Sequence, residues 1–201
     1  MGSRQIPEKY GSRLLKLVRD SIGERLGLVD KVDHSGLAGE ELQQELATFV
    51  TLKIEDRLRG CIGNLEPAGA LLATLAQNGC HAAFNDHRFS PLSIEEFEKV
   101  QIDISILSTP VRLDYADSDQ LLTTLRPNID GVILKKGRAR ATFLPQVWKQ
   151  LPESKQFMEH LSRKAGLSPN GWRGEDVEIY LYQVQSFKEE RHAVDSPPQA
   201  G

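Results

Sequence analysis

The stretch TFVTLKIEDRLRGCIG, residues 48–63, decides the fold. Its first half alternates between two sets of side chains: Val50, Leu52 and Ile54 on one face, and Phe49, Thr51 and Lys53 on the other. This period of two predicts a strand. A second strand, from Leu58 to Ile62, follows directly after a predicted turn at Glu55-Asp56. We therefore expect a hairpin, although neither turn residue is the Gly or Asn that would specify a turn type.

Other segments supply helices and further strands around this hairpin. Apolar spacing predicts helices over 14–28, 69–86 and 157–165, strands over 101–107 and 177–187, and a hairpin over 130–144 that turns at Lys136-Gly137. Because several strands are joined by hairpins, the expected fold class is α/β in the broad sense, of the α+β type. It has a mainly antiparallel sheet packed by helices, rather than a doubly wound parallel sheet.

Length and composition are those of a globular protein. The 201 residues suit one domain, which we place at 7–190, between a flexible lead over 1–6 and a loose tail over 191–201. A net charge of −3 gives no field that attracts nucleic acid or anionic membrane. Two cysteines, no apolar run of spanning length and no signal-peptide pattern predict a cytoplasmic protein without membrane association.

The segment most suited to chemistry is Leu58-Arg59-Gly60-Cys61-Ile62-Gly63. On a strand, Leu58, Gly60 and Ile62 point one way, and Arg57, Arg59 and Cys61 the other. A guanidinium beside a thiol stabilises the thiolate, which is the nucleophile. Gly60 and Gly63 allow a ligand to approach closely, or backbone N–H groups to face an anion.

A structural interpretation of the same segment stays open. A lone cysteine in an apolar strand is most often a small buried hydrophobic residue. Glycines beside it often mark a bulge or tight packing. The spacing G-C-x-G also differs from the G-x-S-x-G of a nucleophile elbow, so it does not favour an α/β-hydrolase.

This segment resembles the signature of the AMMECR domain family, also called component A of the AmmeMemoRadiSam system. The likeness covers about residues 10–190 and continues through four further segments: Ala82-Ala83-Phe84-Asn85-Asp86-His87-Arg88-Phe89-Ser90-Pro91-Leu92, Ile102-Asp103-Ile104-Ser105-Ile106-Leu107-Ser108, Phe143-Leu144-Pro145-Gln146-Val147 and Lys164-Ala165-Gly166-Leu167. The sequence departs from the family pattern at His87 and Ser90, where proline is usual, and at Trp148 and Pro152.

The resemblance implies a fold and partners, but no activity. It implies a larger subdomain that holds both termini, a smaller subdomain, and a cleft between them where the signature lies. It also implies association with a Memo-type protein and a radical-SAM protein. A small molecule or a peptide would be the ligand in such a cleft.

The predicted helix over 69–86 carries a second group of candidates. Cys80 falls on its apolar stripe, where core packing is the expected role. His81 falls on a polar stripe and is a candidate base toward Cys61 or a bound substrate. The alternative for His81 is a surface or capping role.

Three polar residues around the end of this helix complete the candidate binding set. Asn85 shares the polar stripe with His81, Asp86 is suited to accept hydrogen bonds from loop amides, and Arg88 is suited to hold a carboxylate or phosphate. The alternative is an Asp86–Arg88 ion pair that only fixes the loop.

No metal or cofactor site is expected. Cys61, Cys80, His81 and His87 are suitable zinc ligands by type, but their spacing is wrong and no C-x-x-C is present. Lys135, Lys136, Arg138 and Arg140 form a basic hairpin edge. Such charges usually solvate a sheet or block edge pairing, and no nucleic-acid-binding motif accompanies them.

Three functional hypotheses follow. In the first, the protein is an enzyme or enzyme component that uses Cys61 as a nucleophile or covalent carrier. Arg59 stabilises the thiolate, and His81, Asn85, Asp86 and Arg88 line the facing wall. In the second, the same cleft is a binding module without chemistry at sulfur. Nucleic-acid binding through the basic hairpin ranks third.

Overall fold

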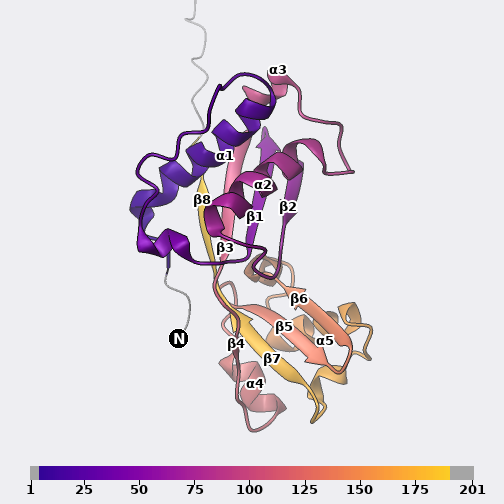
Figure 1. Cartoon of the computed structure of the whole chain (residues 1–201). Helices are drawn as coiled ribbons and strands as arrows, with labels where there is room; N and C mark the ends of the chain where they lie inside the picture. The colour runs from indigo at the N-terminus through magenta and orange to yellow at the C-terminus, as the bar shows by residue number, and fades with distance from the viewer. Residues whose placement is uncertain (1–4, 191–201) are drawn as a thin grey trace, which may run out of the picture. The chain divides into compact units, whose positions relative to one another are not determined.

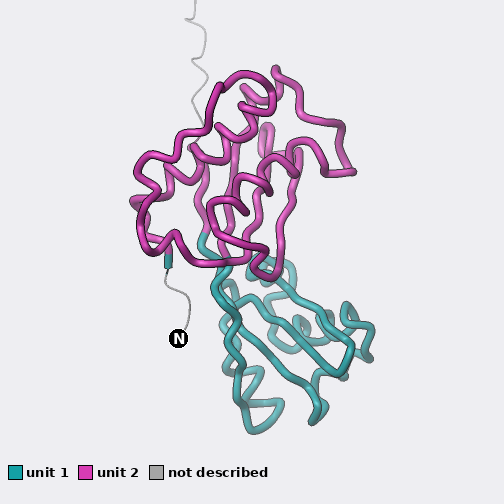
Figure 2. The backbone as a smooth tube through the Cα atoms, in the orientation of Figure 1, with its two compact units in different colours: residues 1–5, 107–185 teal, residues 6–106, 186–201 magenta. Residues whose placement is uncertain are grey.

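The computed structural model describes residues 5–190, which form two compact units (Figure 2). Of these described residues, unit 2 comprises 6–106 and 186–190, and unit 1 comprises 5 and 107–185. Most of the predicted lead and the whole predicted tail lie outside the described residues. Ile6, at the end of the predicted lead, is buried in the unit 2 core at 1% exposure.

Unit 2 is a four-stranded sheet with two long helices on one face (Figure 1). Its strand order is β2-β1-β3-β8, and β1 is antiparallel to both β2 and β3. The elements are α1 (Gly11–Arg25), β1 (Thr48–Ile54), β2 (Arg57–Gly63), α2 (Leu71–Phe84), α3 (Ile94–Phe97), β3 (Gln101–Leu107) and β8 (Val184–Lys188), with 3-10 turns at Glu8–Tyr10 and Glu40–Gln43. The predicted hairpin over residues 48–62 is confirmed.

The core of unit 2 lies between the helices and one face of this sheet. The inward residues of β1, Val50 and Leu52, are fully buried, and so are Ile102 and Ile104 of β3. Because side chains alternate along a strand, the residues between them lie on the opposite side of the sheet, the outer face.

Unit 1 has its own sheet, with strand order β4-β7-β5-β6. Its elements are β4 (Val111–Arg112), α4 (Ser118–Thr124), β5 (Gly131–Lys136), β6 (Ala139–Phe143), α5 (Ser154–Lys164) and β7 (Glu178–Tyr182), with 3-10 turns at Pro145–Lys149 and Gly171–Arg173. Trp148 stacks on Phe157 with ring centroids 3.7 Å apart, and its indole N–H donates to the Asp130 carbonyl at 2.7 Å. Unit 1 therefore has a separate aromatic core.

The expected class of helices packed on antiparallel sheets is confirmed, but two details differ. The predicted strand over 177–187 is two strands, β7 and β8, which belong to different sheets. Its apolar residues serve two cores, with Ile179 in unit 1 and Phe187 in unit 2, because the chain passes from unit 1 to unit 2 after residue 185, within β8. The second hairpin turns at residues 137–138, one residue later than predicted. Within residues 5–190, no helix combines the length and apolar character needed to cross a bilayer.

The β1–β2 turn places two non-glycine residues in the left-handed region. Ile54 pairs with Arg57, which leaves Glu55 at φ 52° and Asp56 at φ 64° as the two turn residues. Positive φ at both central positions is the type I′ pattern, which favours Asn at the first and Gly at the second. The backbone conformation of Glu55 is therefore strained.

We predict that Glu55→Asn raises the free energy of unfolding by about 0.5 kcal/mol, because Asn tolerates the left-handed conformation better than Glu. Urea denaturation measures this change. The control is Glu175→Asn at an exposed turn position without positive φ, which should be neutral. An equal gain at both positions would contradict the explanation.

Candidate functional site

A bulge in β2 sets the direction of the signature side chains. Leu52 pairs with Gly60 and Lys53 pairs with Leu58, so Arg59 is an extra residue without a partner on β1. One extra residue reverses the alternation beyond it. Cys61 therefore pairs with Thr51 on the outer face, and Leu58 leaves the face it was expected to share with Gly60.

Gly60 is required because α2 approaches the strand closely. A Cβ atom at Gly60 would lie 2.1 Å from the carbonyl oxygen of Ala82, a backbone atom that cannot move aside. The space at Gly60 is therefore occupied by the helix. Gly63 is similarly confined, because a Cβ atom there would lie 2.3 Å from the Thr48 carbonyl oxygen and would also meet the Phe49 ring. Both glycines are therefore required for tight packing, as the structural interpretation of this segment expects.

The Cys61 thiol is half-buried among polar neighbours on the outer face. The Thr51 hydroxyl donates a hydrogen bond to the Cys61 sulfur at 3.3 Å. On its other side Thr51 pairs with Asp103 of β3. Asp103 in turn accepts from the Lys53 ammonium at 2.6 Å. A row of polar groups thus crosses β2, β1 and β3 at the level of the thiol.

Asp86 and Arg88 bind the backbone of Cys61 from the free edge of β2. The Cys61 N–H donates to the Asp86 carboxylate at 2.9 Å, and Arg88 donates to the Cys61 carbonyl at 3.4 Å. Arg88 also holds the Asp86 carboxylate through its Nε at 2.9 Å and its Nη2 at 2.6 Å. The Asp86–Arg88 ion pair of the structural alternative is therefore present, and both side chains also contact the signature strand.

The Asp86 carboxylate is strongly held in its charged form. Its side chain is only 2% exposed. Hydrogen bonds from Arg88 and from the Cys61 amide hold the pKa of Asp86 well below its usual range, against the opposing effect of burial. The group is therefore a permanent anion at neutral pH.

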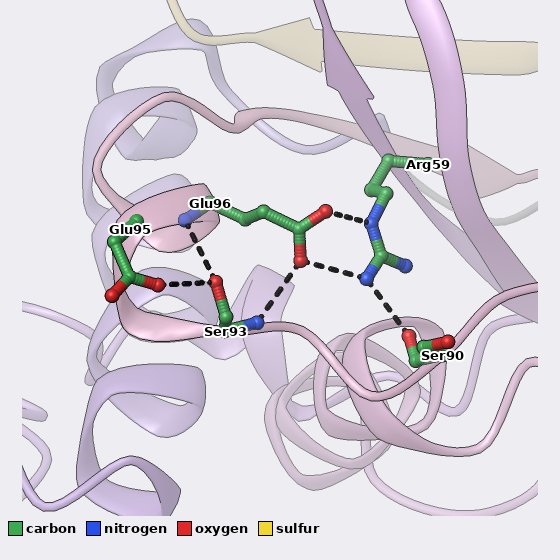
Figure 3. A network of polar contacts seen from close by, with 5 residues as sticks. All are labelled: Arg59, Ser90, Ser93, Glu95 and Glu96. Carbon is green, nitrogen blue, oxygen red and sulfur yellow. Dashed lines mark hydrogen bonds and ion pairs between the residues drawn. The ribbon is translucent and has the colours of Figure 1, made fainter.

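Arg59 contacts α3 and the loop before it (Figure 3). Its guanidinium donates two hydrogen bonds to Glu96, at 2.7 and 2.8 Å, and one to the Ser90 carbonyl at 2.8 Å. Glu96 also closes a capping box with Ser93. Hydrogen bonds from Arg59, then from the Ser93 amide, lower the pKa of Glu96 to about 2. Within residues 5–190, no hydrogen bond joins Arg59 to the Cys61 sulfur.

His81, Asn85 and Cys80 lie apart from the thiol. His81 is half-buried on α2, which covers the face opposite to Cys61, and in the described part of the chain no hydrogen bond links the two. Asn85 caps α2 and is exposed. Cys80 donates to the Ser21 carbonyl at 3.4 Å, and burial raises the pKa of its thiol. Residues 5–190 hold no cluster of three potential metal-ligating side chains.

Sequence reasoning missed Thr51, Asp103, Lys53 and Glu96. A hairpin without a bulge would pair Cys61 with Val50, which faces the core, so only the bulge brings Thr51 beside the thiol. The capping pattern Ser93-x-x-Glu96 is visible in the sequence and could have indicated α3. Its pairing with Arg59 spans 37 residues and has no local signal.

Comparisons with known proteins agree with this architecture. The AMMECR1 family model matches residues 15–187, and the chain belongs to this family. A protein of Methanopyrus kandleri is 32% identical over 198 residues, covering 94% of this chain and 93% of its own. One of Methanothermobacter thermautotrophicus is 31% identical, covering 90% and 94%. The crystal structure of an uncharacterized protein from Pyrococcus horikoshii superposes with a TM-score of 0.76 at 28% identity, covering 92% of this chain and 94% of that one.

We predict that Gly60→Ala lowers the free energy of unfolding by about 3 kcal/mol, because the added methyl group meets the helix backbone. Denaturant unfolding provides the measurement. Gly174→Ala is the matched control, since its nearest neighbour is the end of the flexible Lys136 side chain. Similar losses at both glycines would argue against a specific α2–β2 contact.

Glu96→Gln should destabilise the protein by about 1 kcal/mol at pH 7, a value kept small because the Glu96 side chain is 36% exposed. Since the folded-state pKa of Glu96 is lowered, its contribution is complete above the unfolded value of 4.5 and is lost as pH falls toward 2. Denaturation at pH 7, 5 and 3 should show the difference between variant and parent narrowing. A constant difference would exclude the Arg59–Glu96 charge interaction as its source.

Proposed function

We propose that this protein is a cysteine-dependent enzyme or enzyme component in which the Cys61 thiolate acts as nucleophile or covalent carrier. The observation that supports this is the hydrogen bond from the Thr51 hydroxyl to the Cys61 sulfur on the outer face. A cysteine that served only as core filling would instead lie among aliphatic side chains.

The surrounding residues take distinct roles in this proposal. Thr51 donates a hydrogen bond to the Cys61 sulfur and so positions it, and the Lys53–Asp103 pair supplies charges on the same face. Arg59, Asp86 and Arg88 shape the site, because their charges are already paired within the chain. This proposal assigns His81 no proton-transfer role toward Cys61, because α2 packs against the Gly60 face of the sheet and Cys61 lies on the outer face. Asn85 remains available at the exposed end of α2 as a binding residue.

The proposed partners are a Memo-type protein and a radical-SAM protein, in the cytoplasm, with a small molecule or peptide as ligand. They are supported by the resemblance of residues 58–63 and 82–92 to the family signature. No role in nucleic-acid binding is proposed. The Lys135 ammonium lies over the Tyr180 ring, 4.6 Å from its centroid, and β7 places Glu178 opposite it, so this charge has partners in unit 1.

A binding module without chemistry at sulfur is the second candidate. It is favoured by the pairing of Arg59 with Glu96 and of Arg88 with Asp86. Within residues 5–190, the Cys61 sulfur is hydrogen-bonded to the Thr51 hydroxyl but to no base and no free cation. In that case the outer face would recognise a partner surface. Replacing the thiol by a hydroxyl would then leave partner affinity intact.

Iodoacetamide alkylation distinguishes the two candidates. Because burial raises the Cys80 pKa, that thiol stays protonated at pH 7 and should react slowly, gaining reactivity only at alkaline pH. We expect Cys61 to react at least tenfold faster than Cys80 at pH 7. Thr51→Val should slow Cys61 alkylation several-fold, because the sulfur loses the hydrogen bond that positions it.

Peptide mapping by mass spectrometry assigns the label to each cysteine, and a Cys80→Ala variant isolates the Cys61 rate. Ser105→Ala provides the control, because it removes a hydroxyl from the same outer face, two residues along β3 from Asp103, the partner of Thr51. Equal rates at both cysteines, together with no effect of Thr51→Val, would reject the enzyme proposal in favour of the binding module.

A further inference from the structure

At the free edge of β2, side chains bind the backbone N–H and carbonyl groups of one residue, Cys61. In the strand order β2-β1-β3-β8, β2 has a partner on one side only. An edge strand normally leaves its outward N–H and C=O groups to water or to another strand. At Cys61 both groups instead meet side chains, the N–H at Asp86 and the carbonyl at Arg88.

The pair has the geometry of a substitute strand. A neighbouring antiparallel residue would offer one acceptor and one donor to Cys61. The Asp86 carboxylate supplies the acceptor and the Arg88 guanidinium the donor, and Arg88 fixes the carboxylate with two hydrogen bonds of its own. The Arg88 amide also donates to Asp86, at 3.2 Å. The two side chains thus act as one rigid unit.

Cys61 is held from two opposite sides. Because its N–H and carbonyl point outward, Cys61 and Thr51 form the non-hydrogen-bonded kind of antiparallel pair, in which side chains approach closely. This close approach is what allows the Thr51 hydroxyl to reach the sulfur at 3.3 Å. Loss of the outer contacts would let the strand edge fray and would separate the two side chains.

We propose that Asp86 and Arg88 are positioning residues for Cys61, which hold the strand edge so that Thr51 can donate to the sulfur. This inference rests on the proposed function of the Cys61 thiol. It gives the Asp-x-Arg segment a role in the site without contact to a substrate. A pair that only fixed the loop after α2 would affect stability but would leave the Thr51–Cys61 interaction unchanged.

The test is a double-mutant cycle on Cys61 alkylation in the Cys80→Ala background. Thr51→Val should slow alkylation at pH 7 several-fold when Arg88 is present, and less than twofold in an Arg88→Ala variant. Asp86→Asn provides a second arm, since it keeps the side-chain shape but loses the charge that holds Arg88. Hydrogen exchange at the Cys61 amide should accelerate about tenfold in both variants, equivalent to one lost hydrogen bond.

A matched control comes from unit 1, where Arg126 makes the same kind of pair with Asp130. Arg126 is 54% exposed and its partner fully buried, against 47% and 2% for Arg88 and Asp86. Arg126→Ala should leave Cys61 exchange and the Thr51 effect unchanged.

The outcomes separate the two proposals. A full Thr51 effect in Arg88→Ala, or unchanged Cys61 exchange, would overturn the positioning role while leaving the proposed function intact. No Thr51 effect in the parent would overturn the positioning role, and together with equal alkylation rates at both cysteines it would overturn the proposed function as well. In that case faster exchange in the variants would assign the pair to edge protection alone.

Discussion

The close approach of the α2 backbone to β2 is the contact on which the rest of the site depends. It requires the absence of a side chain at Gly60, because the Ala82 carbonyl occupies that space. With the helix at this distance, the segment that follows it passes along the edge of β2. Asp86 and Arg88 then reach the Cys61 backbone, and the loop that they begin leads to the α3 residues that pair with Arg59.

The charges of the signature segment are largely neutralised within the chain. Arg59 is bound by Glu96, and Arg88 by Asp86, so neither guanidinium lies against the thiol as a free cation. The hydrogen bond to the sulfur comes from an uncharged hydroxyl, that of Thr51, and the Arg88 guanidinium also interacts with Cys61 through its charge. The hydrogen bond depends on geometry, since it weakens steeply with distance and angle, whereas the charge acts over a longer range.

Sequence periodicity predicted most elements because each depends on local spacing. The hairpin over 48–62, the helix over 69–86 and the strand over 101–107 are confirmed within a few residues. The prediction of one continuous strand over 177–187 was wrong, because an apolar run in the sequence cannot show that its two halves pack into different cores. The signature was recognisable, but the partners of Arg59 were not, since Glu96 and Ser90 lie more than 30 residues away.

The sequence by itself determined the three long helices, the antiparallel hairpins, the family and which segment surrounds Cys61. Only the tertiary structure decided which way the thiol faces and what it contacts. The physical reason is the bulge at Arg59, since one extra residue exchanges the two faces of a strand. Arg59 is held at the bulge by its contacts with α3 and with the loop after α2. Because these partners are distant in the chain, no periodicity in the sequence reveals them.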